Sequence, residues 1–458
     1  MLGIGRNAAV RRMNRQMQSF VHPTRLIPMG FAILIAIGTV LLMLPISGAH
    51  GHSVGWLNAL FMSTSAVCVT GLAVIDTGTA FSLFGQVVIM VLIQIGGLGF
   101  MTFGILFAVL LGKQIGLKQR LLIQQATNAV STQGLVKLSL NIFLIAFVLE
   151  SVAMLTLALH WTPELGWKRA WYYGAFYAIS SFNNAGFALK PDSLSEHVGD
   201  PVVNTVVITL FVIGGLGFIV VTDILRKRRW HKFSLNTKLV LVSSLIATVF
   251  GFVFVLAAEW ANPATLGPLS LGDKIWAALF QGVMPRSSGY NTVNIGGLMA
   301  ATQFVFIMLM FIGAASGSTG GGIKINTFAI LLLCLYSVVR GRSEIHAFQR
   351  KISFDTAFRA LAIIMISLGI VVVLTIMLTI TESGSSASFL AIFYEAVSAF
   401  GTVGSSMGLT PHLSPEGKLV IVITMFIGRL GPLALAFALA RNNKPTKYSY
   451  PEEKVLIG

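Results

Sequence analysis

Four short segments of this chain, each centred on a glycine, have the residue types needed to bind a cation through backbone oxygen. They read CVTGLA at 68–73, NNAGFA at 183–188, RSSGYN at 286–291 and TVGSSMG at 402–408, and we call them the glycine turns. Glycine permits an extended or left-handed backbone, which lets carbonyl oxygens point at an ion. The side chains of the turns are mostly small or apolar. Oxygen ligands without a ring of Asp or Glu favour a monovalent cation over calcium or magnesium.

Three residues in each turn are candidate selectivity-filter and cation-binding positions. They are Val69, Thr70, Gly71, Asn184, Ala185, Gly186, Ser287, Ser288, Gly289, Thr402, Val403 and Gly404. The sequence shows no comparable pattern for catalysis, because the chain has no HExxH, GxSxG or phosphate-binding P-loop motif and its eight histidines are scattered. Cys68 and Cys334 lie in apolar stretches and form no CxxC metal motif. The sequence therefore argues against an enzyme.

A second glycine landmark follows each turn after 24 to 28 residues. It reads IGGLGF at 95–100 and at 213–218, IGAASG at 312–317 and IGRLGP at 427–432. One such run alone indicates only close helix packing, because small residues let membrane helices approach each other. Two landmarks that recur four times in the same order predict an internal repeat.

The third landmark continues into a glycine-rich run, which we call the glycine loop. It consists of Gly313, Ala314, Ala315, Ser316, Gly317, Ser318, Thr319, Gly320, Gly321 and Gly322. Each glycine disfavours a helix by about 1 kcal/mol, so the helix should break here. Irregular backbone at membrane depth survives only where it lines water or protein, which makes the loop a candidate gate beneath the turns. The alternative is a kink that packs against neighbouring helices.

Two cationic residues are candidate parts of the same gate. Arg429 lies in an apolar run, where a charge is expensive unless it faces a cavity or a partner. We expect it to face the pore and to pair with carbonyl or hydroxyl groups of the glycine loop; a purely architectural arginine is the alternative. Lys324 follows the loop and either closes the inner entrance or extends to the cytoplasmic interface.

Four further charged residues lie in apolar surroundings. We expect Arg286 and Glu395 to support the turns from behind, with the carboxylate accepting hydrogen bonds from filter amides. Asp223 is expected to pair with Arg226 or Lys227, and Glu150 has no assigned partner.

The composition explains why helices in a membrane must position these residues. Of 458 residues, 55% are hydrophobic and only 10% are charged, whereas about a quarter are charged in ordinary soluble domains. Eight apolar runs are long enough to span a bilayer, at 26–47, 85–112, 138–160, 202–225, 238–258, 301–339, 358–381 and 417–440. Four shorter stretches, at 54–67, 171–183, 272–284 and 387–400, suit re-entrant half-helices.

The basic residues orient these spans. The net charge is +16, and 24 of the 32 Lys and Arg residues fall in alternate segments, which predicts that those segments and both termini are cytoplasmic. A nucleic-acid surface is excluded by the same placement, because the basic residues sit in short loops on one side.

The predicted fold is an all-α polytopic membrane protein of four parallel repeats around a pseudo-fourfold axial pore. Each repeat contains a span, a re-entrant pore half-helix and a second span. The predicted boundaries are a cytoplasmic arm at 1–25, repeats at 26–112, 113–225, 226–340 (with the broken helix and the candidate gate) and 341–440, and a cytoplasmic tail at 441–458.

Five segments carry a family resemblance that covers nearly the whole chain. They are VCVTGLAV at 67–74, SSFNNAGFAL at 180–189, PRSSGYNTV at 285–293, AFGTVGSSMGLT at 399–410 and GSTGGGIKINTF at 317–328. The chain resembles the superfamily of Trk, Ktr and HKT potassium transporters, most closely its KtrB-type membrane subunits. The four turns differ from one another, unlike the TVGYG of potassium channels, so weaker selectivity is expected.

This resemblance implies a potassium-translocating subunit of a bacterial-type uptake system in the plasma membrane. It implies potassium at the backbone carbonyls of the turns, stimulation by sodium, and a homodimer with one pore in each subunit. It also implies a cytosolic nucleotide-binding regulatory ring of KtrA type, so that nucleotide acts only through a partner. A secondary carrier that couples potassium to sodium or proton entry is the alternative.

Overall fold

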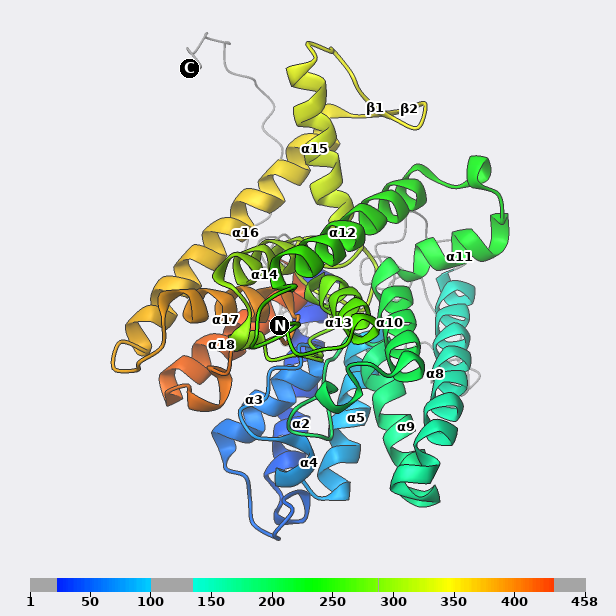
Figure 1. Ribbon diagram of the computed structural model, residues 1–458. Coiled ribbons are helices and arrows are strands. Elements are labelled where there is room, and N and C mark those ends of the chain that lie inside the picture. The colour runs from blue at the N-terminus through cyan, green and yellow to red at the C-terminus, as the bar shows by residue number, and fades with distance from the viewer. Residues whose placement is uncertain (1–22, 100–134, 287, 432–458) are drawn as a thin grey trace, which may run out of the picture.

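The computed structural model describes residues 23–99, 135–286 and 288–431, and most of these residues are helical (Figure 1). The helices are α2 (Pro23–Met43), α3 (Trp56–Val67), α4 (Thr77–Ala80), α5 (Leu83–Leu98), α8 (Leu135–Leu165), α9 (Trp167–Phe182), α10 (Pro201–Leu216), α11 (Phe218–Lys227), α12 (Leu235–Glu259), α13 (Leu271–Val283), α14 (Ala300–Ile312), α15 (Ile325–Val339), α16 (Phe354–Thr381), α17 (Phe389–Gly401) and α18 (Pro415–Leu430). Short 3₁₀ turns lie at Pro45–Ser47, Ser195–His197, Trp230–Lys232, Met284–Arg286, Ile295–Gly297 and Thr410–His412. The predicted tail at 441–458, most of the arm at 1–25 and Ser287 lie outside the described residues.

The helical fold class predicted from composition is confirmed, with one small departure. Two short strands, β1 (Ile345–Ala347) and β2 (Arg350–Ile352), pair antiparallel between α15 and α16. Their turn places Phe348 and Gln349 at positive φ, as a tight hairpin turn requires. The predicted all-α fold therefore carries a hairpin that the apolar pattern did not indicate.

Serine and aspartate residues start most of these helices. Their side-chain oxygens accept hydrogen bonds from N–H groups of the first turn, which leaves fewer of those groups without a partner; each such cap typically stabilises a helix by about 1 kcal/mol. The caps are Asp76, Ser82, Asp200, Ser234, Ser270, Ser353, Ser388 and Ser414.

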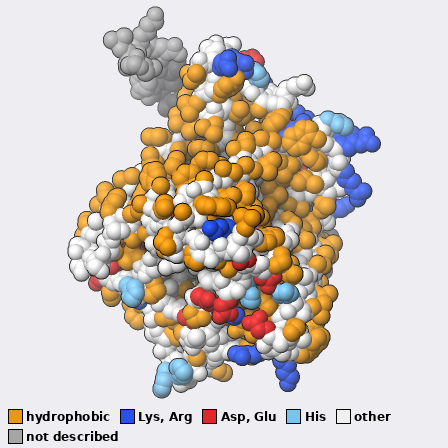
Figure 2. Space-filling view, viewed as in Figure 1, with side chains coloured by type: hydrophobic (Ala, Val, Ile, Leu, Met, Phe, Trp, Pro, Cys, Tyr) orange, Lys and Arg blue, Asp and Glu red, His pale blue; other side chains and the backbone are white. Residues whose placement is uncertain are grey.

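Three described helices are long and apolar enough to cross a bilayer, namely Ser139–Leu165, Leu235–Glu259 and Phe354–Thr381, and α10 with α11 passes the same test as a bent pair. Hydrophobic side chains cover much of the upper part of the face seen in Figure 2. Large hydrophobic side chains are exposed on the long helices, among them Phe250 on α12 and Phe358 on α16. This outer surface is typical of a protein surrounded by lipid. The helix set is that of a polytopic membrane protein, and the number of eight spans stays a prediction.

One predicted span is sharply bent. Within the run 202–225, α10 and α11 meet at 96°. Gly217 joins them with φ +87°, and the N–H of Phe218 donates to the carbonyl of Gly317 at 3.0 Å. The helix bends because a left-handed glycine and a distant partner replace the helical hydrogen bond.

The helices pack in four successive groups. The long first helix of each group lies against its own short helix, in the pairs α2 with α3, α8 with α9, α12 with α13 and α16 with α17. The next helix of each group packs against the short helix of the following group, in the pairs α5 with α9, α10 with α13 and α14 with α17. Contact of α18 with α3 closes the circle, so the C-terminal ends of the four short helices are brought together.

Candidate functional site

The four glycine turns follow the four short helices and share one backbone conformation. Gly71, Gly186, Gly289 and Gly404 all have positive φ, between +69° and +92°. A residue with a β-carbon is strained in this region. Each turn therefore needs glycine for its local backbone, before any neighbour is considered.

The same four glycines also form a closed ring. A β-carbon on any of them would lie under 3.0 Å from a carbonyl oxygen of the next turn along the chain, and the fourth turn meets the first. The pairs are Gly71 with the carbonyl of Ala185, Gly186 with Ser288, Gly289 with Val403, and Gly404 with Thr70. No β-carbon fits at these four positions, so each turn approaches the next through backbone atoms.

The residues before these glycines have already used their N–H groups. Thr70, Ala185 and Val403 donate to carbonyls in the last turn of their own short helix, at 2.8 to 2.9 Å. Their carbonyl oxygens accept no hydrogen bond from other described residues. The ring thus presents unpaired carbonyl oxygens, which are the ligands that a dehydrated monovalent cation requires.

The first residue of three triplets is left-handed as well, although it is not glycine. Val69, Asn184 and Thr402 have φ of 56°, 58° and 48°, and Ser287 lies outside the described residues. Such values are rare for β-branched residues and indicate strain that the surrounding structure must hold in place. Nothing in the residue types of the turns predicts this conformation.

Two of these left-handed residues contact the glycine loop. The Asn184 side chain donates to the hydroxyl of Thr319 at 2.8 Å, and the N–H of Gly321 donates to the hydroxyl of Thr402 at 2.8 Å. Asn184, Thr402 and Thr319 are fully buried. The loop is therefore bonded directly to the second and fourth turns.

The predicted helix break at the glycine loop is confirmed, since α14 ends at Ile312 and α15 begins at Ile325. On one side the loop donates to the end of α10, through Ala315 to the carbonyl of Gly215 at 3.0 Å. On the other side Gly322 donates to the carbonyl of Gly428 in α18 at 3.3 Å. The loop spans the space between the second and fourth groups.

Both candidate cations bind this loop. Arg429 donates to the carbonyl of Thr319, and its second nitrogen, Nη2, donates to Gly96 at 2.5 Å and to Gly97 at 3.2 Å. Lys324 turns back onto the loop, where Nζ donates to Gly320 at 2.6 Å and Gly321 at 3.2 Å. The expected pairing of Arg429 with a loop carbonyl is confirmed, and the contact with α5 was not foreseen.

The second landmark glycines do allow close packing. A β-carbon on Gly96, Gly214 or Gly428 would lie under 3.0 Å from a carbonyl near the C-terminal end of the adjacent short helix. Those carbonyls belong to Val67, Phe182 and Phe400 respectively. In these three groups the landmark thus lets the short helix approach its neighbour closely.

Buried polar side chains support the turns from behind. Arg286 donates to the carbonyl of Ser244 at 2.7 Å, as a supporting residue should. The prediction for Glu395 was wrong in its partners, because its carboxylate accepts from the hydroxyls of Ser406 and Thr410 rather than from filter amides. Asp223 pairs with Lys227 at 2.6 Å, as expected.

The structure identifies hydrogen-bond partners of Glu150, which had no assigned partner in the sequence. Its carboxylate accepts from the amide of Gln94 at 2.9 Å and from Asn183 at 3.2 Å. Asn183 directly precedes the strained Asn184 and also donates to Gln94 at 2.6 Å. The three residues come from α5, α8 and the end of α9, so only the folded arrangement brings them together.

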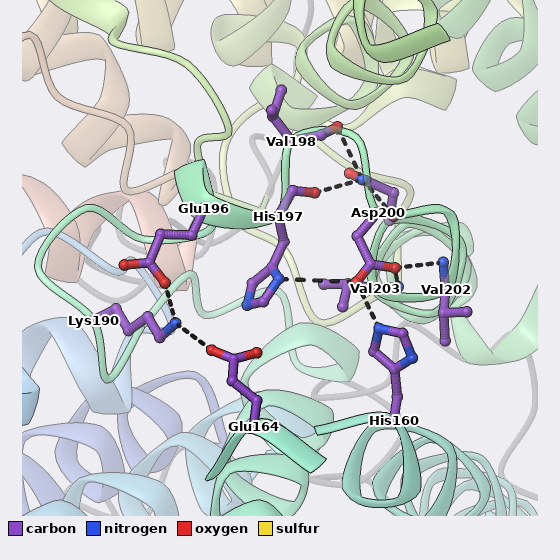
Figure 3. A network of polar contacts seen from close by, with 10 residues as sticks. His160, Glu164, Lys190, Glu196, His197, Val198, Asp200, Val202 and Val203 are labelled. Atoms are coloured by element: carbon purple, nitrogen blue, oxygen red, sulfur yellow. Dashed lines mark hydrogen bonds and ion pairs between the residues drawn. The ribbon is translucent and has the colours of Figure 1, made fainter. Parts of the chain in front are cut away.

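A polar network lies where the connection between α9 and α10 meets the C-terminal end of α8 (Figure 3). His160 and His197 both turn toward Asp200, with His160 at 2.6 Å. Burial alone would raise the pKa of Asp200, but hydrogen bonds from His160 and two backbone N–H groups hold it below its ordinary value. Burial and the charge of Lys190 lower the pKa of His197. The network therefore favours a neutral His197 beside an ionised Asp200.

Comparison with known proteins identifies the relatives of the chain. The family model described as TrkH, cation transport protein, matches residues 7–447. The "Ktr system potassium uptake protein B" of Bacillus subtilis is 46% identical over 95% of this chain and 97% of its own length, and the protein of that name from Vibrio alginolyticus is 39% identical over 95% and 94%. The "Potassium/sodium uptake protein NtpJ" of Enterococcus hirae is 38% identical over 97% of this chain and 99% of its own length.

A solved structure has the same fold. The crystal structure of the potassium transporter TrkH from Vibrio parahaemolyticus matches with a TM-score of 0.68 and covers 90% of this chain and 85% of that one. Sequence identity is 18%, so this match bears on the fold alone.

Proposed function

This chain belongs to the TrkH family of cation transport proteins, and from that premise we propose that it is the potassium-translocating subunit of a Ktr-type uptake system. Potassium would pass along the axis of the ring of glycine turns, bound by backbone carbonyls. The transported ion is the cargo of this site, and no catalytic group is required.

The observation that carries the proposal is the ring itself. Four glycines at positive φ leave no room for a β-carbon against the next turn, and the carbonyls of Thr70, Ala185 and Val403 accept no hydrogen bond from described residues. Such carbonyls replace the hydration shell of a cation without adding a fixed charge. The turns differ in sequence, so the four ligands are not equivalent and discrimination against sodium should be weaker than in a filter of identical strands.

The glycine loop serves as the gate in this proposal. The hydrogen bonds of the loop to Asn184, Thr402 and Arg429 support this role, because they hold the loop against two glycine turns and helix α18. A loop tied at these points obstructs the path beneath the ring, and its opening breaks those bonds. The positive charges of Arg429 and Lys324 add an electrostatic barrier to cations in the closed state.

The remaining parts of the proposal concern context. We place the chain in the plasma membrane with both termini cytoplasmic, as a homodimer with one pore in each subunit. A cytosolic nucleotide-binding ring of KtrA type would dock on the basic cytoplasmic segments, and sodium would stimulate uptake. These features agree with the relatives named for potassium uptake and for potassium/sodium uptake.

Flux measurements test the proposed function directly. The purified chain in proteoliposomes should take up potassium, with rubidium competing well and sodium and lithium competing poorly. Deletion of residues 314–320 should raise flux strongly if the loop is the gate. Absence of potassium flux in both proteins would refute the pore, and unchanged flux on deletion would refute the gate.

The second candidate is a carrier that couples potassium stoichiometrically to sodium or proton entry. The circular packing and the backbone ring favour a continuous pore over a rocking carrier. Potassium flux that persists with no second ion in the buffer supports the pore. A strict requirement for sodium or a proton gradient in fixed ratio supports the carrier.

A further inference from the structure

Helix α11 leaves the helix bundle at a sharp corner. It runs at 96° to α10, which lies beside α8 and α9 (Figure 1). Since α10 runs through the apolar layer, a helix nearly perpendicular to it lies along the surface of that layer. Arginine and lysine end this helix, which places the corner on the predicted cytoplasmic side.

The apolar residues of α11 and of the following turn divide into two sets. Phe218 and Val220 are buried against the bundle, whereas Leu225 is 56% exposed and Trp230 is 48% exposed. An exposed leucine and tryptophan next to several arginines are typical of a helix seated at the level of lipid headgroups.

Most of the basic residues at this end are not neutralised by described residues. Asp223 is the nearby acid, and it already binds Lys227 together with the N–H of Ser234 and the hydroxyl of Thr237. Lys and Arg side chains gather at the upper right of Figure 2, where α11 and the turn after it lie in Figure 1. Four exposed cations of this segment have no ion pair with any described residue. They are Arg226, Arg228, Arg229 and Lys232.

We propose that this basic end of α11 binds the headgroup of an anionic phospholipid in the cytoplasmic leaflet. Guanidinium groups match phosphate oxygens in charge and geometry, while the exposed Leu225 and Trp230 lie where acyl chains begin. A soluble acidic protein would match the charges but would leave these two apolar side chains uncovered by lipid. The observations therefore favour lipid.

The α10–α11 corner links this surface to the glycine loop. Phe218 donates to the carbonyl of Gly317 at 3.0 Å, and Ala315 and Thr319 donate to the carbonyls of Gly215 and Gly214. Since α11 starts at the residue that binds Gly317, a lipid that holds α11 in position also holds the loop. This link rests on the proposed gate, whereas the lipid site does not.

Lipid binding is tested on the full-length protein in detergent, with native mass spectrometry during titration with phosphatidylglycerol. The test variant is Arg226→Gln/Arg228→Gln/Arg229→Gln, and the matched control is Arg340→Gln/Arg342→Gln/Arg350→Gln, three exposed arginines at the end of α15 and in the hairpin. We expect the test variant alone to lose roughly 100-fold in lipid affinity, since each basic residue at an anionic surface contributes about a factor of five.

Three results would overturn the lipid site. They are unchanged binding in the test variant, an equal loss in the control, and displacement of the lipid by an equal concentration of inorganic phosphate. The last result would mean that the site recognises phosphate alone and not a lipid.

The link to the gate is tested by potassium flux in vesicles that contain phosphatidylglycerol. Wild type and both variants are compared in the same vesicles, because an anionic surface concentrates potassium for all of them. Flux of the test variant should rise above wild type, with the control unchanged. Equal flux in all three refutes the link, whereas absence of flux in all three refutes the proposed function and leaves the binding result standing.

Discussion

Replacement of Thr402 with valine isolates the hydrogen bond between the fourth glycine turn and the glycine loop. Valine has nearly the same shape as threonine and is also β-branched, so the left-handed backbone at φ 48° carries similar strain in both proteins. The change removes the hydroxyl that accepts from Gly321 at 2.8 Å in a fully buried position. The buried N–H of Gly321 then has no partner.

A buried N–H without a partner costs about 1 to 3 kcal/mol. If the open loop lets that group reach water, the closed state loses this free energy relative to the open state. The open population then rises about 5- to 150-fold while it remains the minor state. Rubidium uptake into proteoliposomes, measured without a cytosolic partner, reports that population directly.

Thr402→Ser is the matched control because it keeps the hydroxyl acceptor, and its uptake should stay close to wild type. Potassium preference over sodium should be retained in Thr402→Val, because Gly404 and the ring carbonyls are untouched. Wild-type uptake in Thr402→Val would refute the role of this bond in holding the gate. Equal increases in the valine and serine variants would show that packing, not the hydrogen bond, controls the loop.

Three further changes test other parts of the structure. Gly71→Ser should reduce potassium preference over sodium in competition assays, because Gly71 has φ +92° and a β-carbon there would clash with the carbonyl of Ala185. Unaltered preference would exclude Gly71 from the filter. Asp200→Ala should lower the free energy of unfolding by about 1 kcal/mol through loss of the α10 cap, seen as a lower Tm in detergent, whereas a Tm equal to wild type would deny the cap any stabilising role. Because the pKa of His197 is depressed in the folded protein, the unfolded chain binds a proton more readily, and the free energy of unfolding should fall as pH drops below 6.5. The Tm difference between pH 7.5 and 5.5 should therefore shrink in His197→Asn. An undiminished difference would assign the effect to other groups.

The short helices were predictable because length and glycine position are local properties. Helices α3, α9, α13 and α17 fall on the four stretches that were too short to cross a bilayer. A glycine with positive φ follows each of them, and residues with a β-carbon disfavour that backbone conformation. Neither property depends on distant partners, so each can be read from the chain itself.

The partners of the polar residues were not predictable in the same way. Asn184 and Thr319 are 135 residues apart, and Gln94 and Glu150 belong to different groups. A hydrogen bond between such residues exists only once the circle of helices has closed. The sequence marked Glu150 as unusual because burial of an acid is expensive, but it held no information on which amides compensate for that burial.

The bend at Gly217 shows how a local pattern misleads when a distant partner intervenes. Hydropathy alone predicts a single span across 202–225, since apolar residues continue past the glycine. The N–H of Phe218 instead binds the glycine loop, and α11 turns away from α10. A glycine inside an apolar run permits a helix and a corner equally, and the loop 100 residues later decides between them.

The same landmark has two uses in this fold. In three groups its first glycine packs against a carbonyl at the end of a short helix, as Gly96 does with Val67. In the third group Gly313 lies instead against the carbonyls of Gly321 in the glycine loop and of Ile323 directly after it, and α14 ends there. Extra glycines in this one landmark convert a packing contact into a loop that reaches both neighbouring groups. The proposed gate therefore uses surfaces that the neighbouring turns and helices already provide.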